Sequence, residues 1–351
     1  MKPWPYLLAY LMPLSAVVGH YCGGVFHFLT PLLAFGIIPL LDLLVGVEGN
    51  RLPPAELEKL AEKMSFRLIT FFYVPVQVGL VIWGAHVTTH AALTALEWLG
   101  LVLSVGIVTG GIGITVAHEL FHKKNALEKT LGHVLLLTVS YMHFALEHLI
   151  GHHVNVATPR DPATARYGES LYAFYPRTVI NSWRSAWRFE QRRLQRAGLP
   201  LVSRHNRMLW FAALPVLFAL LLGGILGWQA IPYFLAQSVV AFSLLEIVNY
   251  LEHYGLRRRE LAPGRYERVN LTHAWNADQR LTNYFLFKLQ RHADHHVHPQ
   301  RRYQTLRHFA ESPQLPTGYA GMMLLALVPP LWRAVMHPRL AAFQQQYPAN
   351  T

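Results

Sequence analysis

The sequence is poor in cysteine and in charge, and two long stretches of it contain no basic residue. Its single cysteine, Cys22, excludes a disulfide framework and a four-cysteine iron site within this chain. Only 14% of the residues are charged, against roughly 25% in soluble domains, and 52% are hydrophobic. This composition excludes an ordinary soluble protein and indicates a membrane protein.

Lys and Arg are absent from residues 68–122 and from residues 208–256. The basic residues behind the formal net charge of +12 lie between and after these stretches. A nucleic-acid-binding protein would gather them in one groove, so we expect no nucleic-acid partner. The pattern is typical of a multispanning membrane protein, and we expect a single domain over residues 1–351.

Six apolar segments each come close to the ~20 residues that cross ~30 Å of hydrocarbon. They cover residues 4–22, 24–46, 67–88, 91–117, 209–229 and 231–250. Because Lys and Arg favour the cytoplasmic side of an inner membrane, both termini and the segments 118–208 and 251–351 are expected inside the cell. We therefore predict an all-α fold with six transmembrane helices and a cytoplasmic helical cap.

The segment 126–150 is apolar enough to resemble a seventh span. It carries Glu128, Lys129 and Glu147, however, and charged residues are costly in hydrocarbon. We therefore interpret it as a helix lying at the membrane interface.

Nine histidines form four short clusters just past the ends of the spans. They are His118 and His122; His148, His152 and His153; His253; and His292, His295 and His296. Residues three or four apart share one face of an α-helix, so His148 and His152 are expected to bind one ion and His153 another. Neutral imidazole suits first-row metals, and nine imidazoles exceed the needs of one ion. The clusters predict a site for a pair of metal ions.

Carboxylates beside the clusters are candidates for the groups that accept the second N–H of a metal-bound imidazole. They are Glu119, Glu147, Asp161, Glu252 and Asp294; solvated charges at helix ends are the alternative interpretation. Glu246 lies inside a span, and we expect it to support His253 or to line a cavity, with an interhelix hydrogen bond as the alternative. His143 and His298 come nearest to the clusters without matching their spacing, and we expect neither to be a ligand.

Other functions use parts of this pattern. The motif from His118 to His122 is also that of a zinc protease, with Glu119 as the base, but that reading leaves seven histidines without a role. A metal transporter would place its ligands at the bilayer midplane, whereas these clusters lie beyond the span ends. A two-haem electron carrier would need histidine pairs inside facing spans, whereas these clusters lie past the span ends.

Together the motifs resemble the integral-membrane alkane 1-monooxygenases, the rubredoxin-dependent alkane omega-hydroxylases. The matching elements are HELFHK at 118–123, the stretch 147–163, NYLEHYGL at 249–256 and the stretch 289–304, and the resemblance runs from the second span to about residue 340. The histidine boxes alone are shared with membrane fatty-acid desaturases and xylene-type methyl hydroxylases. The third and fourth elements favour the hydroxylases. Ala293 stands where serine is frequent in the family.

The resemblance implies two Fe ions held by the nine histidines, with O2 as a substrate. It implies a rubredoxin, on a separate chain with an NADH-dependent reductase, as electron donor. The product would be the 1-alkanol of a medium-chain n-alkane drawn from the bilayer lipids through a narrow apolar tunnel. Methyl hydroxylation of xylene or cymene and acyl desaturation are the alternatives. We expect the basic face of Arg160 to Arg207, with Arg291, Arg301 and Arg302, to dock an acidic rubredoxin or to hold lipid headgroups.

Overall fold

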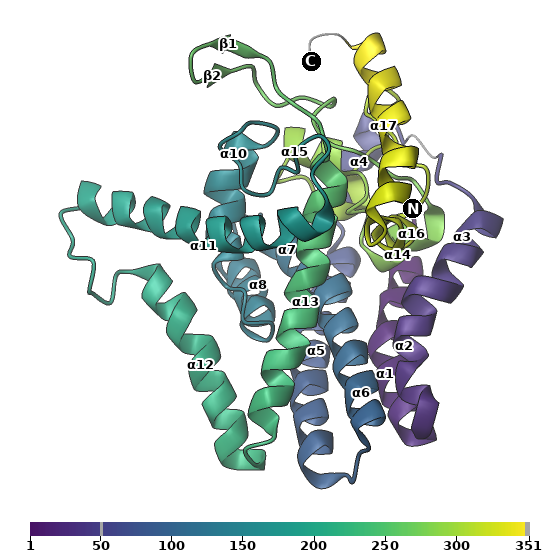
Figure 1. Cartoon of the computed structure of the whole chain (residues 1–351), viewed down its shortest axis with the longest axis vertical. Helices are drawn as coiled ribbons and strands as arrows, with labels where there is room; N and C mark the ends of the chain where they lie inside the picture. Colours follow the sequence, from purple (N-terminus) through teal and green to yellow (C-terminus); the bar gives the residue numbers. More distant parts are fainter. Residues whose placement is uncertain (50–51, 348–351) are drawn as a thin grey trace.

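The chain is described here by a computed structural model of residues 1–49 and 52–347. The described residues form helices and one two-stranded hairpin, which agrees with the predicted all-α class. The long helices stand side by side as a bundle, and the shorter elements gather at one end of it (Figure 1).

The first elements run from the N-terminus to the helix that carries the first histidine cluster, and most of them belong to spans. They are η1 (Trp4–Tyr10), α1 (Leu11–Cys22), η2 (Gly24–Phe28), α2 (Leu29–Leu32), η3 (Leu33–Ile37), α3 (Ile38–Val45), α4 (Pro54–Ala61), α5 (Met64–His90), α6 (Ala95–Ile107), η4 (Val108–Gly113) and α7 (Ile114–Phe121). Of these, η3 and η4 are π-helical turns, and the helix from α6 to α7 continues through η4.

The remaining elements include two spans, and most of the others gather at one end of the bundle. They are α8 (Ala126–Leu137), α9 (Phe144–Leu146), η5 (Glu147–His152), α10 (His153–Asn155), α11 (Leu171–Arg196), α12 (Arg207–Leu226), α13 (Ala230–His253), β1 (Glu260–Ala262), β2 (Arg265–Tyr266), α14 (Arg280–Phe285), α15 (His292–Val297), η6 (Tyr303–Thr305), α16 (Tyr319–Ala326) and α17 (Pro329–Gln346).

Five helical segments among the described residues are long and apolar enough to cross a membrane. They are Gly24–Val45, Ala55–His90, Ala95–Phe121, Arg207–Leu226 and Ala230–His253. These coincide with five of the six predicted spans. The other predicted span, residues 4–22, forms η1 and α1 beside α2 and α3 (Figure 1), but its tyrosines, prolines and His20 make it less apolar. The count of six spans therefore stays a prediction.

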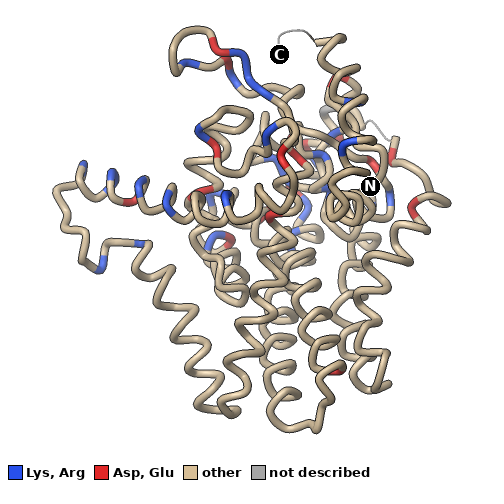
Figure 2. Tube along the Cα trace, viewed as in Figure 1, with Lys and Arg blue, Asp and Glu red and all other residues tan. Residues whose placement is uncertain are grey.

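Charge separates the two ends of the molecule. Lys, Arg, Asp and Glu gather around α10, α11, α15 and the β1–β2 hairpin, whereas the opposite ends of the spans are almost free of them (Figure 2). This distribution is what a bundle embedded in lipid requires, because hydrocarbon cannot solvate a charged side chain.

Residues 126–150 do not form the single interfacial helix that we predicted. After α8 the chain turns through Ser140, at φ 53°, and α9 and η5 lead back toward the histidine clusters. The tip is buried among the spans, where Gln77 Nε2 donates to Thr138 Oγ1 at 2.8 Å and Gln237 Nε2 donates to the Thr138 carbonyl at 2.8 Å. Irregular backbone is tolerated at membrane depth when protein surrounds it and bonds its polar groups. The segment is therefore a re-entrant hairpin.

The helix from α6 to α7 lies at the centre of the bundle, with 83% of its most apolar window buried. Its glycines let neighbouring spans contact its backbone. A Cβ at Gly110 would lie 2.5 Å from the carbonyl oxygen of Ala241 in α13, and a Cβ at Gly113 would lie 1.8 Å from Gln77 Oε1 in α5. Small residues of this kind permit close helix packing in membranes, where no hydrophobic effect drives helices together.

Candidate metal centre

The four histidine clusters meet where α7, η5, α13 and α15 converge at the charged end of the bundle. They divide into two groups, within each of which one nitrogen per ring lies within 4.8 Å of all the others. The first group is His118, His122, His148, His153 and His295, and the second is His152, His253, His292 and His296. These are the nine predicted histidines, and no other described histidine joins either group.

The division within the second cluster differs from our expectation. An α-helical turn would have paired His148 with His152, but the structure pairs His148 with His153 in the first group and sends His152 to the second. The reason is that η5 is a π-helical turn, whose wider turn brings residues five apart onto one face. Spacing alone did not predict this local change of helical period.

The imidazoles face one another through Nε2. The Nε2–Nε2 distance is 2.9 Å between His118 and His148 and 3.0 Å between His148 and His153. In the second group, His292 Nε2 lies 2.9 Å from His296 Nε2 and 3.2 Å from His253 Nε2. Both groups are therefore closed sets of ring nitrogens directed at a common centre.

The groups fit metal ions better than they fit hydrogen bonds. His152 Nδ1 donates to Asp161 Oδ2 at 2.9 Å and His253 Nδ1 to the carbonyl of His273 at 3.2 Å, so the inward Nε2 of each carries a lone pair. Among the described residues, the buried Nε2 atoms of His122 and His152 have no hydrogen-bond partner. Lone pairs that converge without a donor are stabilised by a bound cation.

Burial also keeps the imidazoles neutral, as metal ligands must be. Burial, together with the neighbouring histidines, lowers the pKa well below its usual value in six rings outside the spans. These are His122, His148, His153, His292, His295 and His296. A neutral ring keeps the lone pair with which it binds a metal.

Asp161 has the geometry expected of an orienting carboxylate. Besides accepting from His152, it accepts from Thr164 Oγ1 at 2.6 Å and from the backbone N–H of Ala163 at 3.1 Å. These bonds fix the carboxylate and, through it, the ring of His152. The equivalent support for His253 comes from the backbone carbonyl of His273, which sequence reasoning missed because a carbonyl leaves no signal in the sequence.

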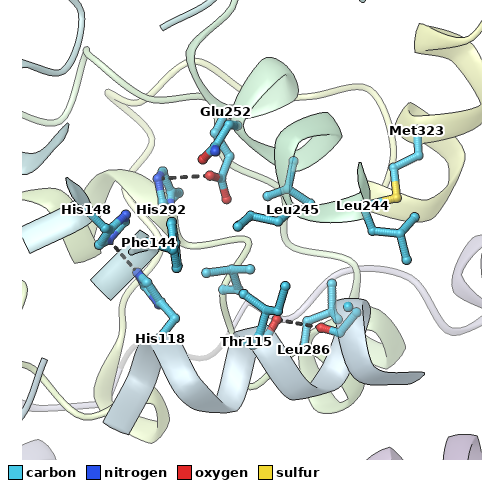
Figure 3. A pocket seen from close by; sticks show the side chains of 16 residues that line it. Thr115, His118, Phe144, His148, Leu244, Leu245, Glu252, Leu286, His292 and Met323 are labelled. Atoms are coloured by element: carbon cyan, nitrogen blue, oxygen red, sulfur yellow. Dashed lines mark hydrogen bonds and ion pairs between the residues drawn. The ribbon is translucent and has the colours of Figure 1, made fainter. Parts of the chain in front are cut away.

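Glu252 contacts a histidine nitrogen that faces into the group, whereas we expected it to accept from a nitrogen that faces away. Its Oε2 is 3.1 Å from Nε2 of His292, the nitrogen that faces the group, and its Oε1 accepts from the hydroxyl of Tyr319 at 2.7 Å. Figure 3 shows the carboxylate pointing toward His292 at the edge of a cavity that His118 and His148 also line. Glu252 therefore borders the space where a reaction would occur.

Two of the other three predicted carboxylates pair with neighbouring side chains outside the histidine groups. Glu119 Oε2 pairs with Lys123 Nζ at 3.0 Å. Asp294 accepts from Arg301 and from His298 Nδ1, which connects α15 to the loop after it.

Glu147 lies close to two other acids outside the histidine groups. Burial raises its pKa well above the usual range, and the nearby carboxylates of Asp161 and Glu246 raise it further. A hydrogen bond with Ser185 opposes this shift. None of the hydrogen bonds described for Glu147, Glu119 or Asp294 reaches a histidine of the two groups.

Glu246 makes the structural contacts that we had treated as the alternative. It accepts from Tyr141 Oη at 2.7 Å, from Thr178 Oγ1 at 2.8 Å and from Asn249 Nδ2 at 3.1 Å. It therefore connects α13 to the re-entrant hairpin and to α11. The expectation that Glu246 supports His253 was wrong, because the hydrogen bonds described for its carboxylate go to Tyr141, Thr178 and Asn249.

Two cavities lie next to each other beside the histidine groups and share part of their lining. The inner cavity reaches His118, His148, His292 and Glu252. The outer cavity is almost entirely apolar, and Met12, Ala34, Phe35, Ile38, Ile107 and Ile112 are among its lining residues. It extends toward α1 and α3, whose outer faces expose large apolar side chains.

Part of the predicted basic face is occupied by internal ion pairs. Arg291 is buried and pairs with Glu48 at 3.0 Å and Asp278 at 3.1 Å, while Arg302 pairs with Glu128 at 2.6 Å. With Arg301 bound to Asp294, these three arginines do not form a free surface. The exposed arginines between Arg160 and Arg207 are Arg160, Arg166, Arg184, Arg188, Arg192, Arg193, Arg196 and Arg204.

Comparison with known proteins agrees with this site. The sequence pattern of the fatty acid desaturase family matches residues 93–326. Alkane 1-monooxygenase 2 of Pseudomonas aeruginosa is 47% identical over 347 residues, which cover 97% of this chain and 92% of that protein. Alkane 1-monooxygenase 2 of Alcanivorax borkumensis is 42% identical, over 98% of this chain and 92% of its own length. The xylene/toluene monooxygenase hydroxylase component of Pseudomonas putida is 27% identical, over 96% and 90%. The chain belongs to the fatty acid desaturase family and, within it, to the alkane 1-monooxygenases.

Proposed function

We propose that this protein hydroxylates the terminal methyl group of medium-chain n-alkanes, using O2 and electrons from a rubredoxin. The observation that carries the proposal is the pair of closed imidazole groups at the inner end of an apolar cavity. The 47% identity to an alkane 1-monooxygenase over nearly the whole chain supports it.

Each imidazole group would hold one Fe ion, so that the first group supplies five ligands and the second four. A terminal C–H bond is strong and unpolarised, and the iron pair would supply the oxidant that acid–base chemistry cannot. One alkane, one O2, two electrons and two protons give one 1-alkanol and one water. The protein itself binds the chain, directs its end and excludes bulk water.

Shape alone can position a featureless alkyl chain. The apolar outer cavity would hold the body of the chain, and the inner cavity would place its last carbon beside His118, His148 and His292. Glu252 is held there by Tyr319 and offers a hydrogen-bonding group for the product hydroxyl. The alkane would arrive from the bilayer, past α1 and α3.

Rubredoxin, reduced by an NADH-dependent reductase, would dock on the exposed arginines between Arg160 and Arg196. In this arrangement the histidine end of the bundle faces the cytoplasm of a cell with the protein in its inner membrane. A basic face attracts an acidic partner, and salt screens that attraction. The rate should therefore fall with ionic strength, whereas a salt-insensitive rate would leave these arginines to lipid headgroups.

The decisive experiment combines metal analysis with product analysis. Purified protein should contain two iron ions per chain and, with rubredoxin, its reductase and NADH, should convert octane to 1-octanol that carries an atom of 18O from labelled O2. Stoichiometric zinc without iron, or an alkene product, would contradict the proposal. Turnover of xylene in preference to octane would favour the aromatic methyl hydroxylases, to which the chain is less similar.

A further inference from the structure

We propose that Gly111 sets the width of the passage between the two cavities and so selects slim, unbranched chain ends. The inference rests on the proposed function and adds a residue that determines its specificity. It starts from the position of Gly111 within η4, the π-helical turn that interrupts the central helix.

The two cavities meet at four residues that line both of them. These are Gly111, Leu244, Leu286 and Met323. Figure 3 places the three side chains on the side of the inner cavity away from His118 and His148. A molecule that extends from the outer cavity to the histidines must therefore pass between these side chains and the backbone of Gly111.

Gly111 differs from the other glycines of its turn. A Cβ at Gly110 or at Gly113 would collide with α13 or α5, which explains those two glycines by packing. A Cβ at Gly111 would meet no atom within 4 Å. Since the residue lines both cavities, that open space is the passage itself.

No backbone requirement explains this glycine either. Gly111 is not among the glycines with positive φ, so an L side chain fits its conformation. Its carbonyl accepts from Thr115 Oγ1 at 2.7 Å, a bond that a substitution would keep. Alanine also has the higher helix propensity. The absence of a side chain is therefore accounted for by the passage.

The opposite wall can yield only in part. Met323 is flexible and adapts to irregular gaps, but Leu244 and Leu286 are branched and pack against the core. A methyl group at position 111 would therefore narrow the passage, and a leucine side chain would fill it. Both changes should act on wide substrates before slim ones.

The test is a series of substitutions at one position, Gly111→Ala and Gly111→Leu, assayed with n-decane and p-xylene. Gly111→Ala should raise the preference for decane over xylene about tenfold, the size of effect that one methyl group has in an apolar pocket. Gly111→Leu should lower decane turnover at least as much. It should also weaken decane binding by the protein without an electron donor, a readout that needs no turnover.

Gly79→Leu is the matched control, because Gly79 is an exposed glycine of the span α5 whose Cβ would also meet nothing within 4 Å. It should leave turnover and binding unchanged. Iron content and thermal stability establish that each variant is folded. If the leucine variant does not fold, Gly111→Ala alone tests the inference. If wild-type protein oxidises decane and the Gly111 variants behave like Gly79→Leu, the inference is overturned and the proposed function stands. If wild-type protein oxidises neither substrate, both fail.

Discussion

Two spans of almost equal hydropathy have opposite surroundings in this protein. The helix from α6 to α7 has a mean hydropathy of 2.1 in its most apolar window, which is 83% buried, whereas the corresponding window of α12 has 2.4 and is 17% buried. Both can cross a bilayer. One is enclosed by protein, and the other presents most of its surface outward.

The difference lies in small and polar residues. In the enclosed helix, Thr109 Oγ1 donates to Gln237 Oε1 at 3.0 Å and Ser104 Oγ to the His27 carbonyl at 2.6 Å. Seven side chains of α12 are large, apolar and exposed, among them Val216, Leu220 and Ile225. Hydropathy therefore predicts which segments enter the membrane, and only small or polar residues indicate which of them contact other helices.

The largest effect on activity is expected at the histidines in which the enclosed spans end. His253→Ala should abolish hydroxylation, a loss of more than about 100-fold, and reduce the iron content, because it removes an inward Nε2 from the second group. His205→Ala is the control, since that side chain is exposed and lies outside both groups. Iron content and octane turnover of membranes with equal protein levels check the pair. Full activity of His253→Ala would remove this residue from the ligand set.

A smaller loss of iron affinity or turnover is expected for a residue that bonds to one of the nine histidines without belonging to either group. Asp161→Asn should lower iron affinity or turnover by about 10- to 100-fold, because the amide holds the ring of His152 less firmly than the carboxylate does. Glu260→Gln, which changes an exposed carboxylate of the β1–β2 hairpin, should keep its iron. Iron retained during dialysis against a chelator measures the effect. Equal retention in both variants would show that Asp161 has no part in orienting the ligand.

A packing test compares the two spans directly. Gly113→Leu should destabilise the protein by about 1–3 kcal/mol or more, because its Cβ would overlap Gln77. Gly224→Leu in α12 should change little, because a Cβ there meets nothing within 4 Å. Thermal unfolding in detergent checks both variants. A similar loss from each would mean that α12 is also enclosed, for instance by a second copy of the chain.

The smallest effect concerns the connection from α11 to α12. Glu190 accepts from Arg193 at 2.7 Å and from Arg207 at 2.6 Å, and despite burial these bonds lower its pKa to about 2. A carboxyl with a depressed pKa stabilises the fold above its ordinary pKa and loses that contribution as the pH falls from about 4.5 to about 2.

Glu190→Gln should therefore cost ~1 kcal/mol at pH 7, and the difference from wild type should vanish toward pH 2. Thermal unfolding measured across this pH range follows the effect, with the exposed Glu311→Gln as control. A difference that persists at low pH would mean that the charge of Glu190 is not what stabilises the connection.

Much of the site could be predicted from spacing, because i, i+4 pairs such as His118 and His122 need only a regular helix. The partition of His148, His152 and His153 could not, since it depends on a π-helical turn that no residue type specifies. The re-entrant hairpin was missed for a related reason. Its apolar residues resemble those of a surface helix, and the partners of its buried turn, such as Gln77 and Gln237, lie far away in sequence.

That hairpin also constrains when the protein can mature. The Thr138 carbonyl accepts from Gln237, which is synthesised 99 residues later, and α15 with its three imidazoles is translated later still. A ribosome-bound fragment that ends before α13 therefore lacks the Gln237 partner of the hairpin and contains only five of the nine rings. Neither histidine group is therefore complete until α15 has been made, because each group includes at least one ring from that helix.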